Sequence, residues 1–282
     1  MVVDLKGVTI QVERIGCDGD VAKWMRLFGE LDGQVDAFGV GGVDMALLFE
    51  GREYPLHAVQ RRLRHVRHTP LVDGRGLKYT LERRVWELAA PALGGVPHFR
   101  HAFMPLAVDR GGMALAVGEV ADEVVYGDLM VGLGLPIPLR GVAAYKRVVG
   151  FLMPFVSWFP LSIIFYGSSG EPPTPKYHRY WQEADLLAGD FTFMLKYLPE
   201  DLAGKTILTN TTTEDNVRLL TERGVHRLIT TTPRYGGRSF GTNVMEAMLT
   251  AYAGQGRPLR PDELNALIDE LDLRPSVAVL NP

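Results

Sequence analysis

Apolar and polar positions alternate at the start of the chain and then change to a helical repeat. Residues 8–15 alternate as a half-buried strand does, and the apolar side chains of 20–31 recur on one face of a helix. The pattern predicts a βα unit at the start of this sequence.

Short apolar runs and turn residues follow, as far as a glycine- and proline-rich stretch at 94–97. Because proline lacks the N–H that a helix needs, the last helix before this stretch is expected to end at Pro91. The predicted elements are a strand at 35–40, a hairpin of strands 45–49 and 52–56, a basic helix at 57–68, a strand at 70–73, a loop at 74–76 and a helix at 79–90.

Beyond residue 97 the predicted strands and helices alternate more regularly. Strands separated by helices are joined by right-handed crossovers and form a parallel sheet. We therefore expect an α/β fold of two lobes, 1–96 and 97–282, the second a Rossmann-like, mostly parallel sheet with helices on both faces. The predicted strands are 102–108, 123–127, 185–189, 206–209 and 227–232, and the predicted helices are 113–121, 140–152, 191–198, 214–223, 240–252 and 261–271.

One apolar stretch departs from this regular pattern. Residues 148–166 carry no charged side chain over a length that is sufficient to span a bilayer. Pro154 and Pro160 interrupt any helix there, and strands of the expected sheet lie on both sides. Buried packing or a dimer contact is the favoured interpretation and membrane contact the alternative, while 171–175 is expected to be a stiff connector.

The composition of the chain limits which partners the protein is expected to bind and in which compartment it is expected to lie. A net charge of −3 leaves no broad basic surface for nucleic acid. The single cysteine, Cys17, cannot form an internal disulfide, and residues 1–20 lack the apolar core of a signal peptide. We expect a cytoplasmic homo-oligomer that binds a small molecule.

The best local signal for a ligand is the strand–turn–helix–strand pattern of 102–128. Gly111 and Gly112 let the backbone approach a phosphate, which the N–H groups of the next helix would hold. Asp128 lies 19 residues after Asp109, about where dinucleotide-binding folds place the acid that binds the adenosine ribose, which favours NAD over NADP. The full G-x-G-x-x-G is absent, and a tight turn with a solvated aspartate is the alternative.

Two polar turns follow later strands. Within 206–217 a strand leads into Thr211, and the next predicted strand contains Thr231 close to its end, before a glycine-rich loop with Arg238 and Ser239. Threonine hydroxyls bind ligands or cap helices, and an arginine beside helix N–H groups suits a carboxylate or phosphate. We expect Thr211 and Thr231 to contact the cofactor and Arg238 and Ser239 the substrate.

The first lobe offers a charged turn of its own, at 73–78. A lysine whose pKa is lowered by burial can move a proton, so Lys78 with Asp73 is a candidate acid–base pair beside a hydroxyl that is oxidised. Arg75 is a candidate for the substrate carboxylate. A surface ion pair is the alternative interpretation.

Two His-x-x-His pairs raise the question of a metal. His65/His68 and His98/His101 have the spacing of one helical face, but no cysteine or carboxylate accompanies them at ligand spacing. We therefore expect no metal site.

Several segments taken together resemble a bacterial family labelled quinate 5-dehydrogenase, over nearly the whole chain. The resemblance implies oxidation of the 5-hydroxyl of a cyclohexane carboxylic acid with a nicotinamide cofactor. The segments are RIGCDGD (14–20), VDAFGVGGVD (35–44), TPLVDGRGLKYTLERR (69–84), AVDRGGMA (107–114), EADLLAGDF (183–191), ILTNTTTEDNVRLLTERGV (207–225) and LITTTPRYGGRSFGTNVMEA (228–247).

The chain departs from the pattern of the better understood shikimate and quinate dehydrogenases in three ways. Their G-x-G-G-A-like turn is echoed only by Gly111, Gly112 and Ala114, and their catalytic lysine–aspartate pair is matched only by the lysine Lys78. The resemblance also implies a strand ahead of 8–15, which this chain is expected to lack.

The sequence therefore predicts an NAD-linked oxidoreductase acting on a small cyclic hydroxy acid such as quinate. A small-ligand-binding α/β protein without redox activity is the alternative, because the same glycines and threonines would serve both.

Overall fold

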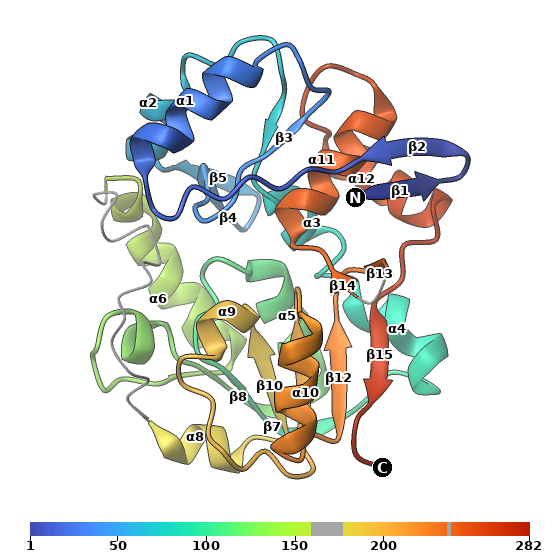
Figure 1. Cartoon of the computed structure of the whole chain (residues 1–282). Helices are drawn as coiled ribbons and strands as arrows, with labels where there is room; N and C mark the ends of the chain where they lie inside the picture. The colour runs from blue at the N-terminus through green and yellow to red at the C-terminus, as the bar shows by residue number, and fades with distance from the viewer. Residues whose placement is uncertain (159–176, 236–237) are drawn as a thin grey trace. The chain divides into compact units, whose positions relative to one another are not determined.

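A computed structural model describes residues 1–158, 177–235 and 238–282, with the side chain of Arg238 left out (Figure 1). The chain forms two compact units, and each is described by itself. Unit 1 contains Met1–Leu77, 154–158 and Thr242–Asp272, and unit 2 contains Lys78–Met153, the described part of 170–241, and Leu273–Pro282.

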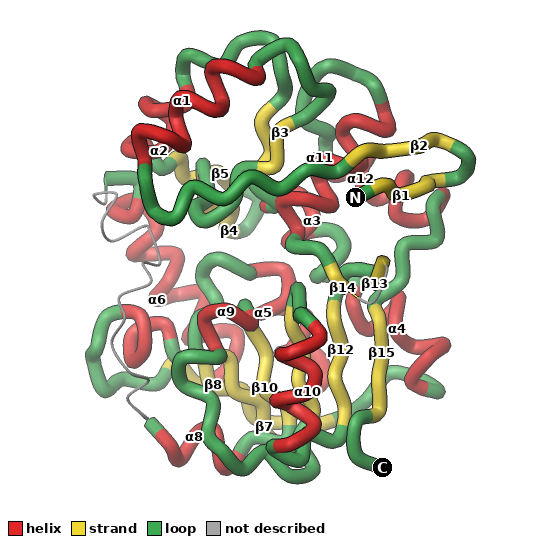
Figure 2. Tube along the Cα trace, viewed as in Figure 1, coloured by secondary structure: helices red, strands yellow, loops and turns green. Residues whose placement is uncertain are grey.

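A seven-stranded mixed sheet forms the centre of unit 2 (Figure 2). Five neighbouring strands run parallel, and an antiparallel strand borders them at each edge. In order across the sheet the strands are β15 (Ser276–Val279), β12 (Arg227–Thr230), β11 (Thr206–Thr209), β10 (Leu186–Gly189), β7 (Phe99–Met104), β8 (Ala121–Tyr126) and β9 (Leu139–Arg140).

The strand order of this sheet confirms the expected fold class. Counted as they occur in unit 2, the strands β9 to β12 stand in the order 3-2-1-4-5-6, which is that of doubly wound dinucleotide-binding sheets. The order reverses between β7 and β10, which pair in parallel through Ala102 and Leu186. In such sheets ligands bind beyond the carboxyl ends of the strands at this reversal.

Helices pack against the sheet of unit 2, including α5 on β7, β8 and β10, and α4 on β15. The core between the layers is apolar and fully buried at Phe103, Trp181, Leu187 and Ile207. The helices of this unit are α4 (Val85–Leu93), α5 (Gly111–Val120), the π-helical turn η1 (Asp128–Gly132), α6 (Gly141–Val156, which ends in unit 1), α8 (His178–Glu183), α9 (Phe191–Met194) and α10 (Glu214–Glu222). A short hairpin of β13 (Arg234–Tyr235) and β14 (Arg238–Ser239) follows β12.

Unit 1 is built from three two-stranded sheets and five helices among its described residues. Its central pair is parallel, and helix α11 contacts both strands of that pair. The elements are β1 (Val2–Leu5), β2 (Val8–Gln11), α1 (Val21–Leu31), β3 (Phe38–Gly39), β4 (Ala46–Phe49), β5 (Arg52–Pro55), α2 (His57–Leu63), β6 (Leu71–Val72), α3 (Arg75–Tyr79, which ends in unit 2), α11 (Thr242–Ala253) and α12 (Pro261–Glu270).

The division of the chain differs from the single boundary expected at residue 96. The first segment of unit 1 ends at Leu77. Helices α11 and α12, near the C-terminal end of the sequence, also belong to unit 1. Close packing explains the return, because a Cβ at Gly39 would lie 2.8 Å from Asn243 O and one at Gly74 would lie 2.5 Å from Asn243 N. The backbones of β3 and of the turn after β6 thus touch the start of α11, a contact that no local pattern announces.

The region expected to be a loop at 74–76 and a helix at 79–90 contains two helices instead. Helix α3 begins at Arg75, and α4 runs to Leu93 with Pro91 inside it. The missing N–H of Pro91 falls in the last turn, and Gly94, in the left-handed region at φ 74°, closes that turn by donating to Ala90 O.

The strand that this chain was expected to lack is present. β1 pairs antiparallel with β2, from Val2 opposite Gln11 to Leu5 opposite Val8. The sequence pattern missed it because only Val3 and Leu5 of this short strand are buried.

The apolar run at 148–166 is only partly described. Its first half belongs to α6, which contains Pro154 and buries Tyr145, Val149 and Met153 at the spacing of one helical face. The remainder and the connector expected at 171–175 lie outside the described residues. No helix in the part of the chain that the structure describes is long and apolar enough to cross a membrane.

Candidate functional site at the carboxyl edge of the parallel sheet

Polar side chains of unit 2 gather at the carboxyl ends of the strands where the order reverses. The loop after β7 leads to Arg110, the residue before α5; Asp190 follows β10, and Asn210 follows β11. These positions meet because β7, β10 and β11 are neighbours that run in the same direction.

Arg110 is the centre of this group, which we call the Arg110 cluster: Lys78, Glu82, Asp109, Arg110 and Asp190. The Arg110 side chain is 4% exposed and donates through Nη1 to Glu82 Oε1 and through Nη2 to Asp190 Oδ2, at 2.8 Å in the second case. Two carboxylates thus hold one guanidinium in a fixed plane.

Asp190 also holds the neighbouring elements in place. Its Oδ1 accepts from Phe193 N at 3.1 Å and so caps α9, while its Oδ2 accepts from Asn210 Nδ2 at 3.0 Å. The Asp190 side chain is 27% exposed and that of Asp109 is 9% exposed, whereas Glu82 is fully buried. The cluster is therefore most accessible at Asp190.

Burial and charge shift the pKa values of the acids in opposite directions. Burial raises the pKa of Glu82 to about 7, against the opposing effect of Arg110 and Lys78, and burial also raises the pKa of Asp109. Burial also acts to raise the pKa of Asp190. The positive charge of Arg110 and the hydrogen bond from Phe193 N have a larger effect, however, and lower this pKa. Separated pKa values among neighbouring carboxyls are typical of acid–base sites.

Three atoms of the Arg110 cluster have no hydrogen-bond partner among the described residues. They are Glu82 Oε2, Asp109 Oδ1 and Arg110 Nε, and each is buried. Asp109 Oδ2 lies 3.8 Å from Arg110 Nε, an ion pair without a hydrogen bond. Buried polar atoms usually have partners, so the cluster retains capacity to bind a further polar group.

Lys78, predicted as a catalytic residue, belongs to this cluster. Its side chain is buried, and its positive charge acts on both Glu82 and Asp109. Asp73, its predicted partner, belongs to unit 1, where Oδ2 accepts from Met45 N at 2.6 Å. Within unit 2, the carboxyl groups on which the charge of Lys78 acts are those of Glu82 and Asp109.

Asp128, predicted to bind the ribose of NAD, supports the loop after β7. Its Oδ1 accepts from Ala107 N at 3.0 Å and from Val108 N at 2.8 Å, and it stands at the start of η1 rather than at the end of β8. Burial raises the pKa of Asp128 to about 6. Asp128 thereby fixes the loop that ends in Asp109 and Arg110.

Gly111 and Gly112, predicted to lie beneath a phosphate, face other residues of unit 2. A Cβ at Gly111 would collide with Tyr79 Oη, and one at Gly112 with Lys78 O. The close approach that needs glycine is therefore an approach of protein to protein. Protein packing thus accounts for glycine at both positions, and a dinucleotide bound by Gly111, Gly112 and Asp128 stays a prediction.

Two of the predicted polar residues of the later strand ends, Thr211 and Ser239, are joined by a hydrogen bond. Thr211 Oγ1 donates to Ser239 O at 2.7 Å, and Ser239 Oγ accepts from Thr212 N at 2.8 Å, which ties β14 to the end of β11. Thr231 Oγ1 is buried and lacks a hydrogen-bond partner among the described residues. The side chain of Arg238 lies outside the described residues.

Unit 1 has a second charged group, which we call the Asp73 cluster: Asp73 and Glu246 are buried, Arg75 is partly buried, and Glu53 is exposed. Arg75, predicted to bind a substrate carboxylate, already pairs with Asp73 at 3.0 Å and Glu53 at 3.2 Å. Glu246 Oε2 accepts from Gly76 N at 2.9 Å and Leu77 N at 3.4 Å, and burial raises its pKa to about 7.

Sequence reasoning missed Glu82, Arg110, Asp190, Asn210 and Glu246. Of these, Asp190 and Asn210 carried a usable signal, because each directly follows a predicted buried strand whose end lies at the ligand-binding edge. Glu82 and Arg110 lie 28 positions apart, and neither their spacing nor their neighbours predicts that they meet.

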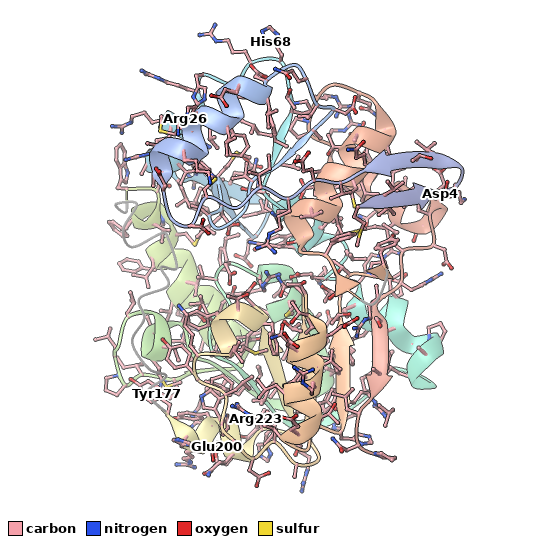
Figure 3. The ribbon with its side chains drawn as sticks, in the orientation of Figure 1. Asp4, Arg26, His68, Tyr177, Glu200 and Arg223 are labelled. Atoms are coloured by element: carbon pink, nitrogen blue, oxygen red, sulfur yellow. The ribbon has the colours of Figure 1, made fainter. Side chains whose placement is uncertain are left out.

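His65, His68 and Cys17 belong to unit 1, and the second histidine pair, His98 and His101, lies at β7 in unit 2. His68 is exposed on unit 1 (Figure 3), His98 pairs with Asp122 at 3.1 Å, and Cys17 is half-buried. In the described part of the chain, no group of three or more histidine, cysteine, aspartate or glutamate side chains is placed to hold a metal ion.

Comparisons with known proteins give a family without a known function. Residues 1–73 match a domain of unknown function (DUF8753), and residues 76–280 match another (DUF8754). Neither the curated proteins nor the solved structures include a match to the chain. Since the second match spans most of the chain, including the whole Arg110 cluster, the protein belongs to the family of the domain of unknown function DUF8754.

Proposed function

We propose that the protein is an oxidoreductase whose Arg110 cluster removes the proton from a hydroxyl of a small cyclic hydroxy acid, such as quinate. The observation that carries the proposal is the buried acid–base cluster at the strand reversal between β7 and β10. Doubly wound sheets bind their ligands at this place, and displaced pKa values mark groups suited to proton transfer.

Asp109 is the candidate proton acceptor. Its Oδ1 is without a hydrogen-bond partner among the described residues, and its raised pKa brings its proton affinity closer to that needed near neutral pH. The positive charge of Lys78 beside it would stabilise the negative oxygen that forms as the hydroxyl loses its proton.

The reaction class requires a hydride acceptor, for which NAD is the proposed cofactor and NADP the less favoured one. NAD would take the hydride that leaves the carbon as the hydroxyl becomes a carbonyl. Because Tyr79 and Lys78 fill the space at Gly111 and Gly112, the proposal places no part of NAD on that turn. A small-molecule substrate, a cytoplasmic location and a homo-oligomeric state belong to the same proposal.

A small-ligand-binding protein without redox activity is the second candidate. The filled turn at Gly111–Gly112 favours it, as does the engagement of Arg110 by Glu82 and Asp190. The two candidates share the site and differ in whether a nicotinamide binds.

The test is NAD reduction, followed by absorbance, with a panel of hydroxy acids that includes quinate and shikimate. We expect turnover in the wild type, a loss of about 10²–10⁴-fold in kcat for Asp109→Asn, and a comparable loss for Lys78→Met. Glu119→Gln, which alters an exposed ion pair with Arg83, is the control and should retain full activity.

Nucleotide binding is measured in parallel as the rise in melting temperature with NAD and with NADP. An inactive panel together with no stabilisation by either nucleotide would overturn the dehydrogenase proposal. Stabilisation by a hydroxy acid alone would then support the binding protein.

A further inference from the structure

The Arg110 cluster contains more acids than cations. Its three carboxyl groups belong to Glu82, Asp109 and Asp190, and its two cations to Lys78 and Arg110. With every group ionised, this buried cluster would carry one uncompensated negative charge. Such a charge is costly in a medium of low dielectric constant, and a carboxyl group avoids the cost by keeping its proton.

The three carboxyl groups are not equally able to keep that proton. Asp190 accepts from Arg110, Phe193 N and Asn210, and its side chain is the most exposed of the three. Glu82 and Asp109 are more deeply buried, and each has an oxygen without a hydrogen-bond partner among the described residues. We therefore expect that proton on Glu82 or Asp109.

Arg110 connects these two carboxyl groups. Its Nη1 donates to Glu82, and its Nε faces Asp109 Oδ2 at 3.8 Å. When Glu82 is ionised it compensates the guanidinium charge and leaves Asp109 less stabilised as an anion; when Glu82 is protonated, more of that charge acts on Asp109. The ionisation of either carboxyl thus opposes the ionisation of the other.

We propose that Glu82 is a positioning residue for proton transfer, which shares a single exchangeable proton with Asp109 across Arg110. This inference rests on the proposed function for its catalytic meaning, since Asp109 is the proton acceptor in that proposal. Glu82 itself, being fully buried behind Arg110, acts on the substrate only through the protonation of Asp109.

The other charged and titratable groups around the pair are fixed by the same packing. Glu82 interacts with Lys78 of α3, with Asp109 and Arg110 before α5, and with Asp190 after β10. Asp109 interacts with Lys78, Arg110 and Asp190, with Asp128 at the start of η1, and with Tyr145 of α6.

The experiment follows the carboxyl carbons by ¹³C NMR between pH 4 and pH 10 in the full chain without substrate. The variants are Glu82→Gln, Asp109→Asn and, as a matched exposed control, Glu119→Gln. In the wild type we expect the Glu82 and Asp109 resonances to titrate in two coupled steps that span neutral pH. In Glu82→Gln, Asp109 should titrate lower by at least about one pH unit, because a neighbouring negative charge is gone.

Asp109→Asn should likewise lower the pH at which Glu82 titrates, and Glu119→Gln should leave the titration of both groups unchanged. An Asp109 titration that stays in place in Glu82→Gln would overturn the proposal. Should that variant not fold, the wild type decides alone, since two carboxyls that remain ionised from pH 5 to pH 9 contradict a shared proton. None of these measurements needs turnover, so they can fail while the dehydrogenase proposal holds.

If the chain turns over a hydroxy acid, the pH profile adds a functional readout. The acidic limb of kcat/KM should move to lower pH in Glu82→Gln by the same amount as the Asp109 resonance. A variant whose activity falls uniformly at all pH values, with no movement of the limb, would show a structural role for Glu82 only.

Discussion

Each unit of the molecule has a charged cluster with buried members, and the two clusters differ in how many of their buried polar atoms have hydrogen-bond partners. In the Asp73 cluster, no buried side-chain oxygen or nitrogen lacks a partner among the described residues, since backbone N–H groups of Met45, Ala46 and Gly76 complete the bonding. In the Arg110 cluster, three buried atoms lack one. A fully bonded cluster is typical of structural support, whereas spare capacity at the carboxyl edge of a sheet favours a role in binding.

Replacing the arginine of each cluster should give the largest difference in stability between the two clusters. Arg110→Met should lower the free energy of unfolding by about 3–5 kcal/mol, because it leaves buried Glu82 without its cation. Arg75→Met should cost only about 1–2 kcal/mol, since Arg75 is 23% exposed and Asp73 keeps its backbone donors. Urea unfolding measures both, and equal losses would contradict the contrast.

The pH dependence of stability separates the two clusters less sharply, because each contains a glutamate whose pKa is raised to about 7. A carboxyl group whose pKa is higher in the folded state binds more protons there than in the unfolded state. Its contribution to the free energy of unfolding is therefore complete below about pH 4.5 and is lost as the pH rises through about 7. The free energy of unfolding should therefore be lower at pH 8 than at pH 5.

Glu82→Gln and Glu246→Gln should each reduce that difference, by up to about 3 kcal/mol. The measurement is urea unfolding of each variant at the two pH values, with Glu119→Gln as the exposed control. An unchanged difference in both variants would show that the pKa values of these acids are close to their unfolded values.

A substitution in the turn at Gly111–Gly112, which packs against Lys78 and Tyr79, should cause a smaller loss of stability. Gly112→Ala should destabilise the protein by about 1–3 kcal/mol, because the new methyl group collides with Lys78 O and the backbone must move. Gly16→Ala is the matched control, since its Cβ would lie 3.9 Å from Asp18 and meet nothing closer. Thermal unfolding compares the two, and a neutral Gly112→Ala would reopen the turn as a place for a phosphate.

The smallest predicted loss concerns the support of the site. Asp128→Asn keeps a side-chain oxygen for Ala107 N and Val108 N but weakens both bonds by removing the charge, at a cost of about 1 kcal/mol. The burial penalty that raises the pKa of Asp128 also disappears, which keeps this cost small at neutral pH. Urea unfolding at pH 7 measures the change, and a loss as large as that of Arg110→Met would show that the loop depends on Asp128 alone.

The periodicity of apolar residues was sufficient to predict many strands and helices of unit 2, but it was insufficient to predict the residues of the Arg110 cluster. The run at 206–209 was predicted with the bounds that β11 has, because four buried apolar and threonine positions lie between clear turn signals. Glu82 could not be found in this way, since a charged residue in a sequence such as Leu81–Glu82–Arg83 reads as surface. Glu82 is buried as the partner of Arg110, which comes 28 positions later in the chain, after α4 and β7.

The same limit applies to unit 1. Asp73 lies at the end of a predicted strand, yet its backbone donors Met45 and Ala46, at the start of the β4–β5 hairpin, lie 28 and 27 residues earlier. Glu246 reaches Gly76 across 170 positions. Contacts of such separation arise from the topology of the chain, which local patterns do not specify.

The return of α11 and α12 to unit 1 has a consequence for how the gene can be divided. A fragment ending at Leu77 would encode β3 and β6 without the helix that packs on them, and its Gly39 and Gly74 backbones would meet water in place of Asn243. A fragment starting at Lys78 would carry that helix with no sheet of its own to cover. Splitting the gene at the junction between the two family domains should therefore yield two insoluble halves, whereas a split that appends residues 242–272 to the first 77 through a short linker should restore the first.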